Sequence, residues 1–222
     1  MTVALFDLDG TLTDPKLGIT RSVAYALARF DIAVDDLDSL VPYIGPPLTE
    51  SFVKFAGLSA DDAWRAVLAY REYYTDTGIY ENVVFPGIEA MLATVAGAGW
   101  RLAVASSKPT VFVARILEHF GLASAFEVVA GAELDGSRQD KAEVIAHALA
   151  GCGVAATPDC VMVGDREHDV HGAKRRGISS VGVTWGYGSL EELTAAAPDA
   201  LVHEVAGLAA YFQDGPGLLL SR

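Results

Sequence analysis

The stretch LFDLDGTLTD (residues 5–14) places three acids, Asp7, Asp9 and Asp14, directly behind an apolar run that begins at Val3. A short, uninterrupted apolar run is typical of a strand that is buried on both faces of a sheet. Two carboxylates about 5 Å apart repel each other by roughly 3 kcal/mol at an effective dielectric constant of about 20. Acids gathered at the end of a buried strand therefore need a compensating positive charge.

Four further apolar runs resemble strands, and helical patterns separate them. The runs are RLAVASS (101–107), FEVVAG (126–131), CVMVGD (160–165) and SSVGVTW (179–185). Helical spacing of apolar residues occurs at 87–98, 110–120 and 141–149, with Asp140 as a candidate N-cap of the last. This alternation predicts an α/β fold, namely a Rossmann-like parallel sheet with helices on both faces.

One long segment, residues 16–82, shows no strand pattern. Three helical patterns fill it, and the third begins at Ser59, where Asp62 completes a capping box. We therefore predict an α/β core formed by residues 1–15 and 83–222, and an all-helical cap formed by residues 16–82. An insert after the first strand lies at the edge where open α/β sheets bind ligands.

Composition limits the classes of function. The chain has 222 residues, of which 51% are hydrophobic, and a formal net charge of −13. This charge argues against nucleic acids and anionic membranes as partners, because like charges repel. We expect no membrane span, since no apolar stretch approaches the length that one requires, and no signal peptide. Two cysteines without metal-type spacing predict reduced thiols in a cytoplasmic protein, which we expect to be a monomer.

A second acidic group lies in VMVGDREHD (161–169), where another apolar run ends at Asp165. If a helix begins near Asp165, its four-residue spacing to Asp169 brings both acids to one helix face. A helix cap and a solvated acid would explain the same residues. The first group could also be a calcium loop, but that pattern fails because the position that requires glycine is Leu12.

The two acidic groups are best interpreted together, because parallel strands end at the same edge of a sheet. We therefore expect Asp7, Asp9, Asp165 and Asp169 to converge. Mg²⁺ prefers oxygen ligands and commonly bridges carboxylates to substrate phosphates. The sequence thus predicts a magnesium site for a small phosphorylated substrate.

Other polar residues fall at the same predicted edge. Ser106 could bind phosphate oxygens, although a serine that caps the next helix gives the same pattern. Lys141 begins a predicted helix, where a cation is unfavourable to the helix dipole, so an anionic partner is indicated. Lys108 and Arg138 are weaker candidates for binding the same anion.

These residues resemble, in order, the signature of the haloacid dehalogenase-like hydrolase superfamily. The matching parts are DLDGT, Ser106 after a core strand, Lys141 before a later helix, and the GD-x-x-x-D of Asp165 and Asp169. Residues 16–82 resemble the helical cap of the phosphoglycolate-phosphatase-like branch. LTDPKLGITRSVAYAL, YIGPPL and GDREHDVHGA are most similar to bacterial members described as phosphoglycolate phosphatases or 5′-nucleotidases.

The resemblance implies a Mg²⁺-dependent phosphatase that hydrolyses a small phosphate monoester through an aspartyl phosphate. It implies that Asp7 is the nucleophile and that Asp9 acts first as an acid and then as a base. It also implies that Asp7, the Asp9 backbone carbonyl and Asp165 hold Mg²⁺, with Asp169 orienting them or binding through water. The implied phosphate-binding residues are Asp7, Gly10, Thr11, Ser106, Ser107 and Lys141, and the loop of Gly45, Pro46 and Pro47 resembles a substrate-facing part of the cap.

Three alternatives remain open. A phosphomutase of the β-phosphoglucomutase type shares every core residue but returns the phosphoryl group to a sugar. A dehalogenase would need neither Asp9 nor a metal, and the intact set of residues argues against a non-catalytic binding protein.

We expect Asp14 to cap the first helix of the insert, and His168 and His171 to be solvated or to pack.

Overall fold

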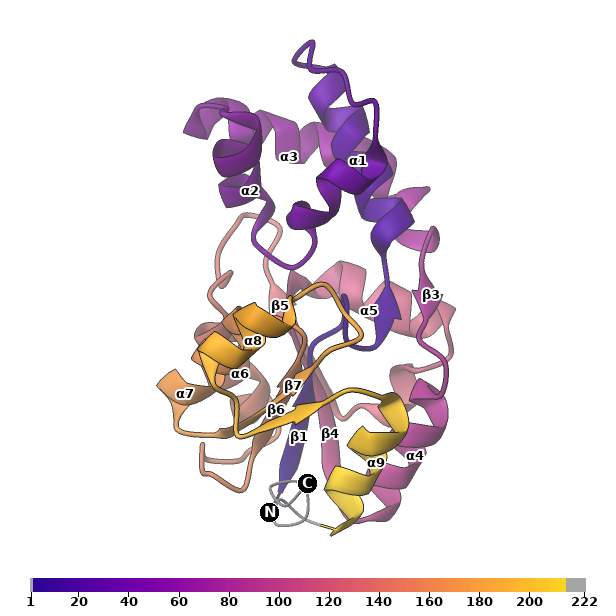
Figure 1. The fold of residues 1–222 in the computed structure, drawn as a ribbon, viewed down its shortest axis with the longest axis vertical. Coiled ribbons are helices and arrows are strands. Elements are labelled where there is room, and N and C mark those ends of the chain that lie inside the picture. Colours follow the sequence, from indigo (N-terminus) through magenta and orange to yellow (C-terminus); the bar gives the residue numbers. More distant parts are fainter. Residues whose placement is uncertain (1, 215–222) are drawn as a thin grey trace. The chain divides into compact units, whose positions relative to one another are not determined.

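The computed structural model describes residues 2–214, and the chain forms two compact units within them. Residues 2–13 and 84–214 make up the core unit, and residues 14–83 make up the helical unit (Figure 1). Residues 215–222, the end of the predicted core, lie outside the described residues. That the helical unit acts as a cap over the site stays a prediction.

The core unit contains a six-stranded sheet in the order β5-β4-β1-β6-β7-β8. Every neighbouring pair of strands is parallel. The α/β fold with a parallel sheet, as predicted from the alternating pattern, is therefore confirmed. The strands are β1 (Val3–Phe6), β4 (Arg101–Pro109), β5 (Val128–Ala132), β6 (Val161–Gly164), β7 (Ser179–Val183) and β8 (Ala200–Val202).

The register brings the carboxyl end of β1 close to the carboxyl end of β6, while β4 on the other side continues to Pro109. Phe6, the last residue of β1, lies opposite Val104 of β4 and Val163 of β6. The residues that follow these positions therefore emerge side by side at one edge. This edge is where the sequence predicted that the acids would converge.

Helices cover both faces of the sheet (Figure 1). Leu5 packs in a cluster with Val144 and Ile145 of α6, whereas the ring of Phe6 contacts Phe212 of α9. Burial on both faces explains why β1 is an uninterrupted apolar run. The helices of this unit are α4 (Ile88–Gly97), α5 (Thr110–His119), η3 (Ala123–Ala125), α6 (Lys141–Gly151), α7 (Glu167–Arg176), α8 (Leu190–Ala196) and α9 (Val205–Asp214).

The helical unit contains the three helices that its sequence pattern predicts. The Ser59 hydroxyl accepts the backbone N–H of Asp62 at 3.1 Å and so caps the third helix, as expected from the capping box. Two short 3₁₀ helices complete the unit. Its elements are α1 (Lys16–Ala28), η1 (Leu37–Tyr43), α2 (Leu48–Ala56), α3 (Ala60–Tyr74) and η2 (Gly78–Tyr80).

The chain leaves and re-enters the core unit through two adjacent segments. These segments, β2 (Thr13–Asp14) and β3 (Val83–Val84), form a two-stranded sheet. On the core side, the Phe85 N–H donates to the carbonyl of Leu12 at 3.1 Å. On the helical side, the Gly18 N–H donates to the carbonyl of Glu81 at 3.0 Å. The outgoing and the returning segment are thus hydrogen-bonded to each other within each unit. Across residues 2–214, no helix is both long and apolar enough to cross a membrane.

Candidate active site

The turn after β1 is closed by one carbonyl and one glycine. The carbonyl of Leu8 accepts the backbone N–H groups of residues 11–13, at distances of 2.9–3.2 Å. Gly10 has a φ of +82°, which L-residues with a side chain rarely adopt. A Cβ on Gly10 would also lie 2.3 Å from Oδ2 of Asp165. Glycine at residue 10 therefore permits the turn, and it also permits the close approach of this turn to Asp165, which follows β6.

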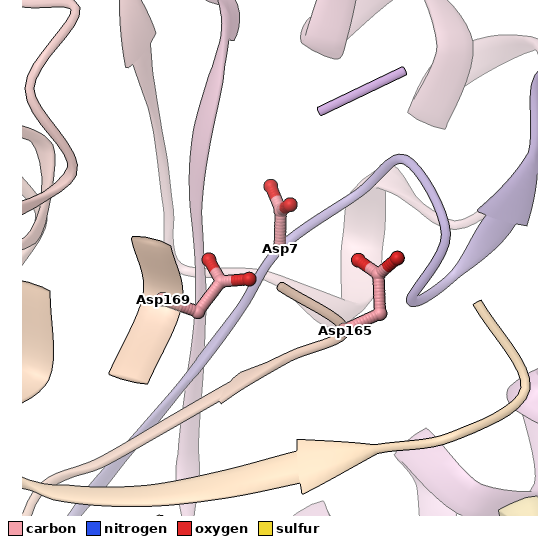
Figure 2. Close-up of side chains that lie close together, drawn as sticks. All are labelled: Asp7, Asp165 and Asp169. Carbon is pink, nitrogen blue, oxygen red and sulfur yellow. The ribbon is translucent and has the colours of Figure 1, made fainter. Parts of the chain in front are cut away.

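Three carboxylates gather at this edge of the sheet, those of Asp7, Asp165 and Asp169 (Figure 2). One oxygen of each lies within 4.8 Å of the others. The residues are 5%, 1% and 1% exposed. Oδ1 of Asp7 and Oδ1 of Asp169 are buried, and the ammonium of Lys141 lies within 3.1 Å of both. These buried oxygens are suited to an ion, and an all-carboxylate set favours a hard cation.

Lys141 lies between two of these acids. Its Nζ is 3.1 Å from Asp7 Oδ1 and 2.7 Å from Asp169 Oδ1, and it donates to the carbonyl of Ala105 at 3.1 Å. The side chain starts at the first residue of α6, which Asp140 caps by accepting two backbone N–H groups. Burial would lower the pKa of Lys141, but the charges of Asp169 and Asp7 outweigh it and raise that pKa. The predicted anionic partner of Lys141 is therefore, in this structure, a pair of carboxylates.

Asp9 points its carboxylate to a different lysine. The Lys108 Nζ lies 2.6 Å from Asp9 Oδ1. Burial raises the pKa of Asp9 even though Lys108 lowers it, and the charge of Asp7 adds to the rise. Because a general acid needs a proton near neutral pH, this direction of shift suits the role implied for Asp9.

The carboxyl groups of Asp165 and Asp169 also have raised pKa values. Burial, followed by the charges of Asp169 and Asp7, raises the pKa of Asp165 to about 8. Burial raises the pKa of Asp169 as well, against the lowering effect of Lys141. Repulsion and burial thus keep protons on this cluster when no cation is bound.

The helix expected to begin near Asp165 begins later, and the expected shared helix face is wrong. α7 starts at Glu167, after Arg166 in extended conformation, so Asp165 lies in the preceding loop. Asp169 is in the first turn of α7, where its Oδ2 accepts the backbone N–H of Arg166 at 3.1 Å. A capping interaction therefore turns Asp169 back toward Asp165.

The loop after β7 holds Asp165 in place, a role that was not predicted from the sequence. The Tyr187 N–H donates to Asp165 Oδ2 at 2.7 Å, and the Trp185 indole N–H donates to the carbonyl of Thr11 at 3.1 Å. A Cβ on Gly186 would lie 2.4 Å from Asp165 Cβ, and one on Gly188 would lie 1.9 Å from the Asp165 carbonyl oxygen. The G-Y-G spacing was the available signal, since paired glycines often mark close backbone approach.

The remaining predicted core residues lie near the same edge. Ser106 is buried, and its hydroxyl accepts the Lys108 N–H at 3.4 Å. Ser107 follows it within β4 and is partly exposed. Thr11 is buried and donates its hydroxyl to Asp165 Oδ1 at 3.3 Å, so it supports a carboxylate of the cluster.

Other residues singled out in the sequence lie elsewhere. Gly45, Pro46 and Pro47 connect η1 to α2 within the helical unit. Asp14 accepts the backbone N–H of Lys16 at 3.0 Å, so it supports the start of α1 as expected, although Pro15 is the N-cap residue. His168 and His171, which we expected to be solvated or to pack, are exposed on α7.

Comparisons with known proteins identify the family of this chain. The chain belongs to the haloacid dehalogenase-like hydrolase family, which matches residues 4–183. A 5′-nucleotidase of Pseudomonas aeruginosa is 49% identical over 209 residues, covering 94% of this chain and 93% of that protein. A tyrosine-protein kinase, PtkA of Mycobacterium tuberculosis, is 44% identical over 90% of this chain and 68% of that protein.

The fold is shared with a solved structure as well. The crystal structure of a predicted phosphatase from Clostridium acetobutylicum has a TM-score of 0.93 and 44% identity, covering 96% of this chain and 99% of that one. The predicted family and the predicted class, a phosphatase among the hydrolases, are therefore confirmed.

Proposed function

We propose that this protein is a Mg²⁺-dependent phosphatase that hydrolyses a small phosphate monoester through an aspartyl phosphate on Asp7. The observation that carries the proposal is the buried cluster of Asp7, Asp165 and Asp169, in which the ammonium of Lys141 lies against Asp7 and Asp169. A site of this composition joins a carboxylate nucleophile to positive charge that can bind phosphate oxygens.

The charge balance supports a bound cation. The four acids Asp7, Asp9, Asp165 and Asp169 carry four negative charges when ionised, and Lys108 and Lys141 supply two positive ones. The ionised acids outnumber the lysines, also when Asp9 carries the proton that it donates, and this excess of negative charge favours a cation at the site. The carboxylates of Asp7, Asp165 and Asp169, with the Asp9 carbonyl, would hold the ion. When bound, Mg²⁺ stabilises negative charge on the phosphoryl oxygens.

The protein's own residues then divide the reaction into two displacements. An Asp7 oxygen bonds to phosphorus while the bond from phosphorus to the ester oxygen breaks, and Asp9 gives its proton to the departing alkoxide. Water next bonds to phosphorus as the bond to Asp7 breaks, and its proton goes to Asp9. Ser106, Ser107, Lys141 and the backbone at Gly10 and Thr11 are the proposed contacts to the phosphoryl oxygens.

The helical unit is the proposed source of specificity. We propose that residues 16–82 act as a cap and that Gly45, Pro46 and Pro47 contact the substrate. Closure of such a cap would exclude water during phosphorylation of Asp7. The name of the Pseudomonas relative supports a nucleoside monophosphate as one candidate substrate, beside phosphoglycolate-like esters. We also propose that the protein is a cytoplasmic monomer without nucleic-acid or membrane partners.

The test is a panel of nucleoside 5′-monophosphates, 2-phosphoglycolate and sugar phosphates, assayed with Mg²⁺ and with chelator. The wild type should release phosphate only with Mg²⁺, and Asp7→Asn should abolish release. Asp14→Asn is the matched control, because Asp14 is an acid of the same stretch whose carboxylate supports α1. Intact-mass analysis of quenched wild type should show one added phosphoryl group, and Asp7→Asn should show none.

Four outcomes would contradict the proposal. Phosphate release in chelator would contradict the proposed role of the metal. Release that survives Asp7→Asn would contradict the proposed nucleophile. Isomerisation of a sugar phosphate without net phosphate release would instead identify a mutase. Transfer from ATP to a tyrosine side chain, the activity that the name of the Mycobacterium relative denotes, would identify a kinase.

A further inference from the structure

The Lys108 ammonium and the Asp9 carboxylate form an ion pair that is nearly closed to solvent. Lys108 Nζ contacts both carboxylate oxygens, at 2.6 Å for Oδ1, and the two side chains are only 7% and 9% exposed. Lys141 pairs with Asp7 and Asp169. The two lysines of the site therefore serve different carboxylates.

A backbone irregularity places Lys108. Ala105 of β4 lies opposite Ala130 of β5, but the next paired residue, Pro109, lies opposite Ala132. Four residue steps on β4 thus face two on β5, so the segment that holds Lys108 bulges at the edge of the sheet. A Cβ on Gly131 would lie 2.3 Å from the Lys108 carbonyl oxygen. Glycine at residue 131 therefore permits the bulge that brings Lys108 to Asp9.

Stability alone does not account for this pair. Removing an ammonium and a carboxylate from water is costly, and an apolar side chain of similar volume often replaces a buried ion pair without loss. What the pair supplies is orientation, because a cation that contacts both carboxylate oxygens restricts rotation of the group. Proton transfer requires this restriction, since a displaced acid cannot reach its leaving group.

We propose that Lys108 is the positioning residue for Asp9, which it holds in the orientation that transfers a proton to the leaving group. The inference rests on the proposed function, in which Asp9 is the general acid. Lys108 acts through Asp9 and is not assigned a contact with the reacting phosphoryl group. Its loss should therefore affect only those substrates whose departure requires protonation.

The test compares kcat/KM for two leaving groups in Lys108→Met. The constant kcat/KM reports steps up to release of the leaving group, so the shared hydrolysis of the aspartyl phosphate does not enter. A general acid contributes about 10²–10⁴-fold, and we expect Lys108→Met to lose about 10–100-fold with the best alkyl phosphate of the panel. With p-nitrophenyl phosphate, whose leaving group is a weak base, we expect a loss of less than about threefold.

Two comparisons separate positioning from a general structural effect. Asp9→Asn should show the same dependence on the leaving group, and adding Lys108→Met to it should cause no further loss, as residues that act as a unit require. Lys108→Arg should recover part of the activity with the alkyl phosphate. Lys174→Met is the charge-matched control, because Lys174 is exposed and donates to the carbonyl of Ala196. Its kcat/KM should be unchanged.

The outcomes distinguish this inference from the proposed function. Equal losses of Lys108→Met with both leaving groups, or a further loss in the double variant, would overturn the positioning role while the phosphatase activity stands. A rise in KM with both substrates would make Lys108 a substrate-binding residue and also overturn it. Absence of Mg²⁺-dependent phosphate release by the wild type would overturn the proposed function itself, and this inference with it.

Discussion

Gly10 lies against the carboxylate of Asp165, although the two residues are far apart in the sequence. A Cβ at residue 10 would meet Asp165 Oδ2 at 2.3 Å and Oδ1 at 2.8 Å. The turn after β1 and the end of β6 therefore share a space that only glycine leaves open. This contact makes the position of a proposed metal ligand sensitive to one methyl group.

We predict that Gly10→Ala lowers kcat/KM for phosphate release at least about tenfold, which corresponds to about 1.4 kcal/mol. The added methyl group would displace Asp165, and the positive φ would add strain of roughly 1–2 kcal/mol. The change in melting temperature caused by Mg²⁺ should also decrease. Gly97→Ala is the control, because nothing lies within 4 Å of a Cβ at that helical position. Equal behaviour of the two variants would refute this prediction.

We predict that Mg²⁺ stabilises the protein more at pH 8.5 than at pH 6. The pKa of Asp165 is about 8 in the folded, metal-free protein, whereas the ordinary value is 3.8. Between these two values the folded state holds a proton that the unfolded state has lost, so metal-free stability decreases as the pH rises. Mg²⁺ must displace that proton, so its binding strengthens over the same interval.

Melting temperatures with Mg²⁺ and with chelator, measured from pH 5.5 to 9, test this dependence. In Asp165→Asn, the stability lost in chelator as the pH rises should be smaller, and the Mg²⁺ effect should largely disappear. A Mg²⁺ effect that is independent of pH in the wild type would contradict the prediction.

We predict that Lys141→Met destabilises the metal-free protein by about 3–5 kcal/mol, because it leaves two buried carboxylates without their cation. Urea unfolding in chelator measures this loss, and Mg²⁺ should restore part of it by supplying positive charge. The kcat should decrease by a factor on the order of 10²–10³, as expected when a group that stabilises transition-state charge is removed. Lys141→Arg keeps the charge and should be the more stable variant. An unchanged urea midpoint in Lys141→Met would show that the ion pairs contribute nothing to stability.

We predict that Ser59→Ala and Ser189→Ala each lower the free energy of unfolding by about 1 kcal/mol. Ser59 caps α3 of the helical unit, and Ser189 caps α8 of the core unit by accepting the Glu192 N–H at 3.0 Å. Neither serine belongs to the proposed site, so kcat should stay near the wild-type value. Urea unfolding followed by circular dichroism measures both effects. A loss of less than about 0.3 kcal/mol in both variants would show that neither cap contributes, because typical cap losses are larger.

Much of the core could be predicted from the sequence because buried parallel strands read as continuous apolar runs. β1, β4, β5, β6 and β7 were each recognisable in this way. By contrast, β8 has only three residues, Ala200–Val202, and so gives too short a signal. The end of β4 was also recognisable, but its bulge was not, because pairing with β5 determines it.

The candidate site was predictable where residue type carries the chemistry. Asp7, Asp165, Asp169 and Lys141 were expected together, and the structure brings them together. The partner of Asp9 could not be identified, because Lys108 reaches it through a bulge that the sequence does not reveal. The loop of Gly186 and Gly188 has no charged residue to attract notice, and only the missing Cβ atoms explain its closeness to Asp165.

The paired crossings of the chain have a consequence for how this architecture varies. Leu12 and Phe85 are hydrogen-bonded within the core unit, and Gly18 and Glu81 within the helical unit. An insert whose two ends already lie together adds little loop-closure entropy to the core, and doubling its length would cost only about 0.6 kcal/mol more. Helical units of different size or sequence can therefore be exchanged at this junction while the carboxylates stay in place. If the helical unit selects the substrate, as proposed, the chemistry and the choice of substrate can evolve on separate segments of one chain.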